Sequence, residues 1–125
     1  MADLLNFELV SPERLLSSGK VAMVVVPGAE GDFAILPGHA PLMSTIRPGA
    51  IAIYETDSDT LTRRIFVDGG FAEVSERGLT ILAESAIPIA DIDPGQVATD
   101  LAAARAAGND NATARLEAMQ AAIVN

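Results

Sequence analysis

Short apolar segments separated by turn residues follow one another through most of the chain. Proline, glycine, aspartate or serine stands between successive segments, which recur at roughly 8–12-residue spacing. This pattern predicts many short antiparallel strands, and it leaves open whether they form a sandwich or a barrel. No helix-length periodic segment interrupts the series, which disfavours alternating strand–helix architecture. The apolar segments are residues 7–10, 20–26, 33–36, 42–46, 49–54, 61–67, 71–74 and 79–83.

Individual segments carry more specific predictions. The β-branched run Lys20–Val26 indicates one strand that is buried on both faces and stopped by Pro27-Gly28. Residues 71–74 alternate, which predicts Phe71 and Glu73 on one face and Ala72 and Val74 on the other. Glu55–Thr60 is a polar hairpin connection, and Asp68–Gly70 is a tight turn.

The pattern becomes helical after residue 88. Asp93 suits a helix N-cap, Pro94 the first helical position, and Gly108 the residue after a helix end. Apolar positions then recur in steps of three and four, which indicates two helices of about 14 residues in an antiparallel hairpin. The recurring positions are Val97, Leu101 and Ala104 in the first helix and Ala112, Leu116, Met119 and Ile123 in the second.

We therefore predict a mainly β chain with an added helical part. Residues 1–88 form an antiparallel β-sandwich or barrel domain, and residues 89–125 form a helical hairpin domain. The many alanines of the hairpin bury little apolar area per residue, so the pair needs support from another surface. Two alternatives stay open: the hairpin docks permanently on the β domain, or it can detach and rearrange.

Charge and composition narrow the classes of partner. The formal net charge is -9, which disfavours nucleic acid and anionic lipid and favours a protein partner. The chain has no cysteine and one histidine, so thiolate chemistry and multi-histidine metal sites are excluded. No apolar run is long enough to insert into a membrane, and the acidic start is unlike a secretory signal or transit peptide.

Candidate catalytic groups are few. The lone histidine, His39, lies in the segment Pro27–Leu42, which also holds three prolines and three glycines. Glu30 and Asp32 form a carboxylate pair in its first turn, but no nucleophile or phosphate-binding motif accompanies them. The pairs Asp57/Asp59 and Asp91/Asp93 fit a solvated turn and a helix cap better than acid–base chemistry. The segment Pro27–Leu42 therefore indicates a rigid contact surface, and we expect no enzyme activity.

The same segment resembles the epsilon subunit of F-type ATP synthase, whose mitochondrial counterpart is called delta. The resemblance covers essentially the whole chain. It is carried by Pro27-Gly28-x-x-Gly31-x-x-x-Ile35-Leu36-Pro37-Gly38-His39-Ala40-Pro41-Leu42, Ile46-x-Pro48-Gly49, Gly69-Gly70-Phe71 with Val74, the opening Phe7–Pro12, and Asp91-Ile92-Asp93.

The resemblance implies a non-catalytic subunit of the rotor's central stalk. Such a subunit links gamma to the ring of c subunits and couples proton translocation to ATP synthesis. It is peripheral on the cytoplasmic face of the bacterial inner membrane. By position, Ser11, His39 and Ser44 lie near gamma, and Glu30 and Asp32 face the c-ring.

The helical part departs from the family pattern. Some relatives bind ATP through Ile-Asp-x-x-Arg-Ala, whereas here Ile92 and Asp93 are followed by Gln96 at the arginine position. A neutral amide lacks the arginine's charge-assisted phosphate contact. We therefore expect weak or absent ATP binding and self-inhibition, weak nucleotide contacts at most at Ile92 and Asp93, and no resident cofactor. The resemblance also implies contacts of the hairpin with the alpha or beta subunits.

The alternative from another functional class is a nucleotide-binding regulatory sensor. In that case the helical hairpin clamps ATP against the β domain near Glu84 and Ile92. A ligand-gated hairpin loses much of its amide-exchange protection without nucleotide, whereas the hairpin of a plain stalk subunit does not.

Overall fold

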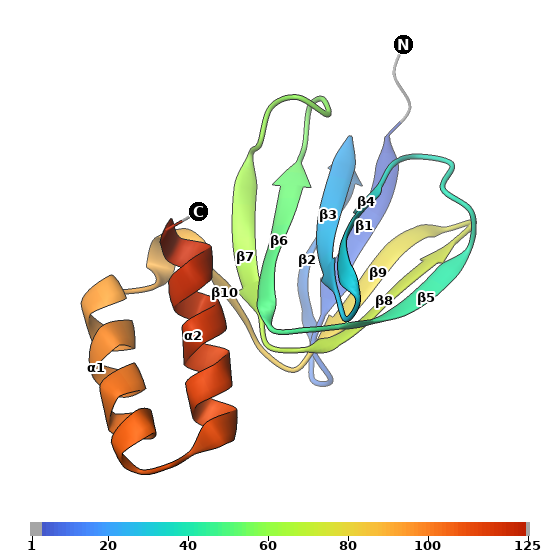
Figure 1. Ribbon diagram of the computed structural model, residues 1–125. Helices are drawn as coiled ribbons and strands as arrows, with labels where there is room; N and C mark the ends of the chain where they lie inside the picture. Colours follow the sequence, from blue (N-terminus) through green and yellow to red (C-terminus); the bar gives the residue numbers. More distant parts are fainter. Residues whose placement is uncertain (1–3, 125) are drawn as a thin grey trace.

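The computed structural model describes residues 4–124, which form a β-sandwich followed by a helical hairpin (Figure 1). Met1–Asp3 and Asn125, at the ends of the two expected domains, lie outside the described residues. The strands are β1 (Leu5–Val10), β2 (Leu15–Val21), β3 (Met23–Gly28), β4 (Gly31–Ile35), β5 (Leu42–Ile46), β6 (Gly49–Tyr54), β7 (Arg63–Val67), β8 (Gly70–Ser75), β9 (Gly78–Ala83) and β10 (Ala86–Pro88). The helices are the 3-10 turn η1 (Ile89–Asp91), α1 (Pro94–Ala106) and α2 (Asp110–Val124).

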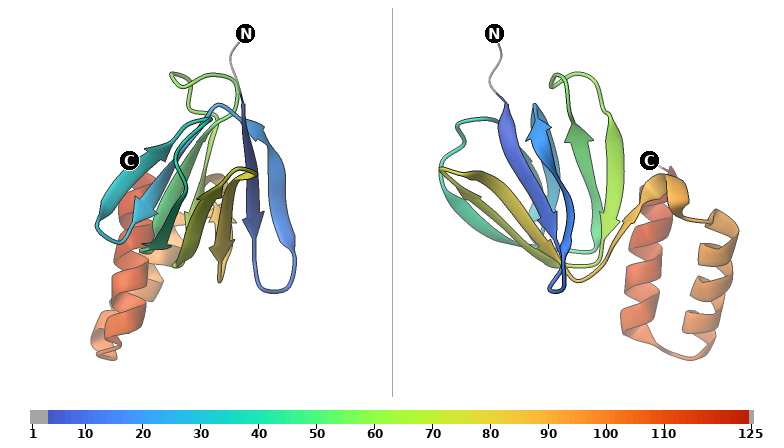
Figure 2. Two further views of the ribbon diagram at one scale, coloured as in Figure 1. Left: turned by 90° about the vertical axis from the view of Figure 1, so that its right-hand side faces the viewer. Right: turned by 180° about the vertical axis from the view of Figure 1, so that it is seen from behind.

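The strands form two layers that meet at one point. One layer runs β4-β3-β6-β7-β10, and the other runs β5-β8-β9-β1-β2. They are joined where Gly28 of β3 pairs with Ile46 of β5, so the sheet folds over on itself as a sandwich (Figure 2). The predicted sandwich is thus confirmed. The antiparallel prediction is wrong for one pair, because β1 runs parallel to β9.

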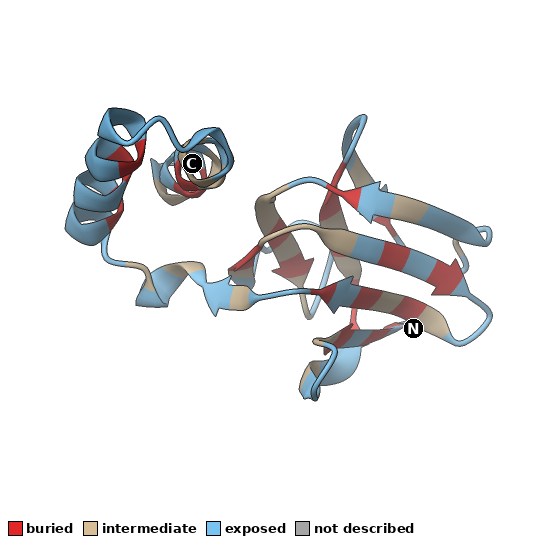
Figure 3. Ribbon diagram, turned by 90° about the horizontal axis from the view of Figure 1, so that it is seen from below, coloured by how far each residue is buried: buried red, intermediate tan, exposed pale blue. Residues whose placement is uncertain are grey.

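Alternate residues of both layers fill the core between them. Figure 3 shows buried and exposed positions alternating along several strands, as expected for sheets with one inner face. Ala72 and Val74 point inward while Phe71 and Glu73 are exposed, as the sequence predicted. The fully buried core side chains of the sandwich include Phe7, Leu9, Val24, Val26, Ile35, Ile51, Ile53, Val67, Leu79 and Ile81.

The run Lys20–Val26 is not one strand. It is divided at Ala22, because Val21 ends a strand of one layer and Met23 begins a strand of the other. Burial is also one-sided in β3, where Val24 and Val26 are buried and Val25 is only half-buried. The sequence shows no break at this change of layer, because both strands contribute apolar residues to the core. Pro27-Gly28 does not stop β3 but forms its last two residues.

The polar connection between β6 and β7 is held by its own side chains. The Asp57 carboxylate accepts hydrogen bonds from the backbone N–H groups of Asp59 (2.9 Å) and Thr60 (2.8 Å). The Asp59 N–H, followed by the Thr60 hydroxyl, lowers the pKa of Asp57 below its ordinary value. These contacts support a structural role for Asp57 in a solvated turn.

The helix ends follow the sequence signals. Asp93 Oδ1 accepts from the N–H of Gly95 at 2.9 Å and that of Gln96 at 3.4 Å, which caps α1. Gly108 has a φ of 69° just beyond α1. Asn109 Oδ1 then accepts from the N–H of Ala112 at 3.1 Å. The predicted antiparallel hairpin is therefore present, with helices of 13 and 15 residues.

The hairpin covers part of the outer face of the β6–β7 layer (Figures 1 and 2). Phe66 of β7 points away from the sandwich core and is 1% exposed, because the helices enclose it. Ala122 is buried in the hairpin core, whereas the predicted core residue Ile123 is only partly buried. The second core consists of Phe66, Val97, Leu101, Ala104, Leu116, Met119 and Ala122.

Two arginines connect the hairpin to the sandwich. Arg115 of α2 lies 3.7 Å from the Asp68 carboxylate, and the Arg64 guanidinium donates a hydrogen bond to the Ala122 carbonyl oxygen. Within residues 4–124, no helix is both long and apolar enough to cross a membrane.

Candidate functional site

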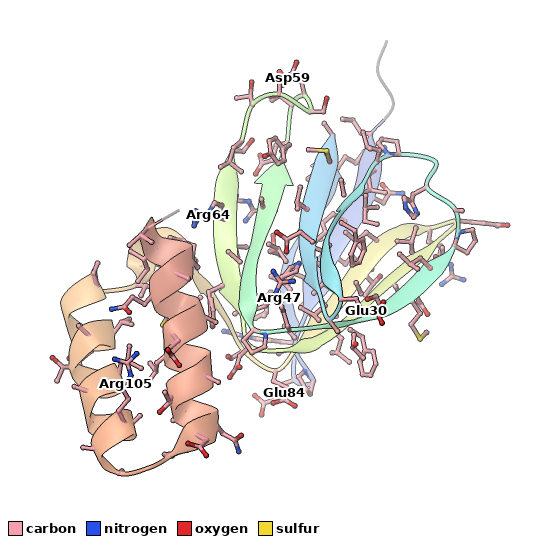
Figure 4. All side chains as sticks on the ribbon, viewed as in Figure 1. Glu30, Arg47, Asp59, Arg64, Glu84 and Arg105 are labelled. Atoms are coloured by element: carbon pink, nitrogen blue, oxygen red, sulfur yellow. The ribbon has the colours of Figure 1, made fainter. Side chains whose placement is uncertain are left out.

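The turns at one end of the sandwich carry most of the candidate interface groups. The β1–β2, β3–β4, β5–β6 and β7–β8 connections and the segment after β9 all lie at the lower end in Figure 1, which we call the turn end. Figure 4 shows Glu30 and Glu84 at this end, from two different connections. Glu30 is exposed, and no described residue forms an ion pair with it.

Asp32 has a different environment from Glu30. Its Oδ1 accepts a 2.6 Å hydrogen bond from Arg47 Nη2, and the Arg47 Nη1 donates to the Gly28 carbonyl oxygen, also at 2.6 Å. The Asp32 charge is therefore already balanced within the chain. Of the two acids expected to face a partner, Glu30 alone lies at the turn end without an intramolecular ion pair among the described residues.

Glu84 is a turn-end acid that the sequence did not single out for this role. It follows β9 directly and is exposed, like Glu30. Asp68, in contrast, is engaged by Arg115. No sequence signal joins Glu84 to Glu30, since they reach the same end of the sandwich only when the strands are arranged in layers.

Ser11, His39 and Ser44 lie in three different neighbourhoods. Ser11 is in the β1–β2 turn, where its hydroxyl donates to the Arg14 carbonyl oxygen at 3.3 Å. His39, in the β4–β5 loop, lines a hollow with the β8–β9 turn, and its Nδ1 lies 2.7 Å from the Ala40 carbonyl oxygen. Ser44 of β5 is paired with Ala72, and its hydroxyl donates to the Thr45 carbonyl oxygen.

These contacts do not assemble a catalytic centre. The imidazole of His39 and the hydroxyls of Ser11 and Ser44 each bond to backbone groups nearby in sequence. A nucleophile needs a base within hydrogen-bond reach, and these three residues do not supply that pair. Within residues 4–124, no three His, Cys, Asp or Glu side chains are grouped so that they could hold a metal ion.

The outer face of the β5-β8-β9-β1-β2 layer carries a mostly apolar row, of which three apolar side chains are exposed. The pairings align Thr45 with Phe71, Phe71 with Leu82, Leu82 with Val10, and Val10 with Leu15, across five adjacent strands. We call these five residues the outer row. Phe71 is 49% exposed, Leu82 41% and Leu15 52%.

The next row of the same face is acidic at two positions. Met43 pairs with Glu73, Glu73 with Thr80, and Thr80 with Glu8. Met43 is the most exposed of the large apolar residues on this face, at 66%. An apolar row beside two carboxylates is typical of a protein interface with an apolar centre and a charged rim.

The outer row leaves a faint signal in the sequence. In 79–83 the inward residues Leu79, Ile81 and Ala83 alternate with Thr80 and the apolar Leu82. Apolar residues at both the inward and the outward positions of a strand indicate that each face of the strand contacts apolar groups. The pairing of Leu82 with Phe71 and Val10, however, depends on strand register.

The candidate nucleotide contacts are engaged within the hairpin. Ile92 packs partly buried against the second core, and Asp93 caps α1. The Gln96 side-chain amide donates to Asp100 Oδ1 at 2.8 Å. Each of these side chains therefore has a structural role in the described conformation.

Comparison with known proteins places these features in a family. Residues 4–89 match the family model described as ATP synthase, Delta/Epsilon chain, beta-sandwich domain. The ATP synthase epsilon chain of Maricaulis maris is 60% identical over 105 residues, which cover 84% of this chain and 77% of the relative. The ATP synthase epsilon chain of Parvibaculum lavamentivorans is 57% identical over 105 residues, covering 83% and 77% respectively.

A solved structure supports the fold. A chain of the Euglena gracilis mitochondrial ATP synthase, in a structure containing OSCP, F1 and the c-ring, superposes with a TM-score of 0.76. It is 23% identical, and the superposition covers 95% of this chain and 76% of that chain. By the family match over the sandwich and the identity to two epsilon chains, this chain belongs to the delta/epsilon chain family of ATP synthase.

Proposed function

We propose that this chain joins the gamma subunit to the c-ring in the rotating central stalk of ATP synthase. It is a non-catalytic subunit, as its family membership establishes. One observation carries the proposal: a single rigid sandwich presents two exposed surfaces of different chemistry, the outer row and the turn end. The Euglena gracilis F1/c-ring assembly and a Tetrahymena thermophila central stalk/c-ring assembly contain chains of the same fold. From this role we infer that the chain lies at the cytoplasmic face of the bacterial inner membrane, as a peripheral subunit of the complex.

The outer row is the surface that suits gamma. Burying Phe71, Leu82 and Leu15 against a protein partner removes apolar surface from water, which is favourable by about 25 cal/mol per Å². Glu8 and Glu73 beside the row favour a partner with lysine or arginine at the rim. Ser11 adjoins this row after Val10. Ser11 therefore borders the contact. Ser44 lies on β5 next to Met43 but on the opposite, inner side of the strand, so it is near the contact without facing it.

His39 marks a second part of the gamma contact. It lies beside the β8–β9 turn and is only partly buried, at the opposite end of the layer from the β1–β2 turn. The two flanking prolines restrict its loop, so the imidazole is presented at a set position. This arrangement supports a positional role for His39 at the edge of the interface.

The turn end is the surface that suits the c-ring. Glu30 and Glu84 supply exposed negative charge to basic side chains of the ring's polar loops. Asp32 contributes to this surface through its ion pair with Arg47 and not as a free charge. Contacts between exposed charges are screened, so ring binding weakens as salt rises.

We propose a two-domain arrangement, in which residues 1–88 form the stalk-binding β-sandwich domain and residues 89–125 form a helical hairpin domain. We expect weak or absent self-inhibition, because the hairpin presents few basic groups and Arg105 is paired with Glu117 at 3.2 Å. Contact of this hairpin with acidic alpha or beta subunits is correspondingly weak.

Weak or absent ATP binding follows from the occupied side chains at the start of α1. Asp93 is the helix cap and Gln96 bonds Asp100, so neither offers charge-assisted contact to a phosphate. Calorimetric titration of the full chain with Mg-ATP is expected to give no heat at micromolar ligand. A dissociation constant in the micromolar range or below would favour the regulatory sensor instead.

Reconstitution tests the proposed function. Vesicles carrying ATP synthase stripped of its epsilon subunit are energised with a proton gradient, and ATP synthesis is measured before and after adding the purified chain. Synthesis is expected to rise with added chain and to saturate at one chain per complex. Unchanged synthesis at saturating chain would overturn the proposal.

A further inference from the structure

Arg47 of the β5–β6 connection holds the end of the neighbouring β3–β4 hairpin at several points. Its backbone N–H donates to the Pro27 carbonyl oxygen at 3.0 Å. Its guanidinium donates through Nη1 to the Gly28 carbonyl oxygen and through Nη2 to Asp32 Oδ1, both at 2.6 Å. One arginine therefore contacts both strands of the hairpin whose tip is Ala29-Glu30.

The hairpin tip is closely packed and is held by the neighbouring strand as well as by Arg47. A Cβ at Gly28 would lie 2.7 Å from the Gly31 carbonyl oxygen and 2.7 Å from the Phe33 ring, so no side chain can be placed there. The Ala29 N–H donates to the Thr45 carbonyl oxygen at 3.0 Å. The backbone of residues 28 and 29 is thus fixed by residues 45 and 47, on the next strand and its connection.

The guanidinium uses two of its donors in a way that lysine cannot copy. The planar fork places Nη1 and Nη2 on two different acceptors at once, whereas an ammonium group is a single point charge. The Asp32 and Arg47 side chains are 61% and 44% exposed, so the charge attraction alone is screened. The contribution of Arg47 lies in geometry: it connects the tip to the body of the sandwich.

We propose that Arg47 is a positioning residue for the c-ring contact, which fixes the turn that presents Glu30 and withdraws the charge of Asp32 from the contact. This inference rests on the proposed function and adds to it a residue that need not touch the ring. It also explains why Glu30 and Asp32, which are two residues apart, have different roles.

Electrostatics and positioning predict opposite signs for one substitution. Arg47→Gln removes a positive charge from the turn end and releases the Asp32 carboxylate. If charge alone governs affinity for basic ring loops, R47Q binds the ring more tightly. If Arg47 positions Glu30, R47Q binds more weakly despite its greater negative charge.

The chain offers a matched control for this charge change. Arg14 lies in the β1–β2 turn at the same end, and its guanidinium makes no hydrogen bond or ion pair within residues 4–124. Arg14→Gln therefore changes the charge by the same amount without loosening the β3–β4 tip. The full chain, bound to gamma, is titrated with purified c-ring. We expect R47Q to lose about fivefold or more in affinity, which corresponds to about 1 kcal/mol.

The companion variants have defined outcomes. R14Q is expected to bind as tightly as the unchanged chain or more tightly, and R47K is expected to lie between R47Q and the unchanged chain. R47Q binding as tightly as R14Q would overturn the inference. Glu30→Gln is expected to weaken binding; if it leaves ring affinity unchanged, the proposed ring contact at Glu30 fails, and the positioning role fails with it.

Amide exchange of the chain without the ring distinguishes two ways in which the inference can fail: Arg47 does not hold the tip, or it holds the tip without affecting ring binding. The Ala29 amide is expected to exchange at least about tenfold faster in R47Q, while core amides of β8 and β9 keep their rates. An unchanged exchange rate at Ala29 would show that Arg47 does not fix the β3–β4 turn. Faster exchange together with unchanged ring affinity in R47Q would instead refute its role in ring binding.

Discussion

Replacing Phe71 by aspartate is expected to weaken binding to gamma by at least about 100-fold while the sandwich stays folded. Phe71 is at the inner part of the outer row, between Thr45 and Leu82, and its side chain is 49% exposed in the free chain. Central aromatic residues carry much of the energy of an interface, and their loss costs about 2 kcal/mol or more. Aspartate adds the cost of burying a charge without a partner.

A similarly exposed apolar residue provides the control. Leu61 is 47% exposed in the connection before β7, away from the outer row. Gamma affinity is measured by surface capture for Phe71→Asp and Leu61→Asp, with thermal melting to confirm folding. Equal affinity in the two variants would contradict the assignment of the outer row. Leu82→Ala gives a second, milder disruption of the same row if Phe71→Asp melts early.

Phe66→Ala is expected to release the helical hairpin from the sandwich. Phe66 is the sandwich residue fully buried in the second core, so truncation leaves a cavity between Val97, Leu101, Met119 and their neighbours. Truncating a buried phenylalanine costs about 3–5 kcal/mol. The alanine-rich helices have little other apolar area with which to offset that loss, and the remaining contacts include the polar ones made by Arg115 and Arg64.

Hydrogen exchange shows which elements lose stability in Phe66→Ala. The amides of α1 and α2 are expected to lose protection, whereas the strands keep theirs, because Phe66 lies outside the core between the two layers. Phe71→Ala serves as the control, since an exposed phenylalanine leaves no cavity. Unchanged protection of the helices, or equal loss in the strands and the helices, would contradict two separately held cores.

The sequence predicts the elements of this fold well where a local signal exists. Asp93 and Gly108 take the helix-end positions that their chemistry favours. Phe71 and Ala72 fall on the predicted faces, because alternation along one strand needs no knowledge of its neighbours. The helix core at Val97, Leu101 and Ala104 follows from spacing alone.

The rest depends on contacts between segments far apart in the chain. The change of layer at Ala22 and the parallel pairing of β1 with β9 have no local signature. Asp32 and Glu30 look equivalent in sequence, and only the approach of Arg47 from the next connection separates their roles. The outer row likewise exists only through the register of five strands.

The central claim is that one chain bridges gamma and the c-ring through two separate surfaces. Sedimentation of purified c-ring with labelled gamma tests it directly, with and without this chain. The chain is expected to carry gamma down with the ring. Phe71→Asp is expected to leave the chain on the ring without gamma, and Glu30→Gln to leave it on gamma with less ring. If either substitution removes both partners equally, or neither, the two-surface account is wrong.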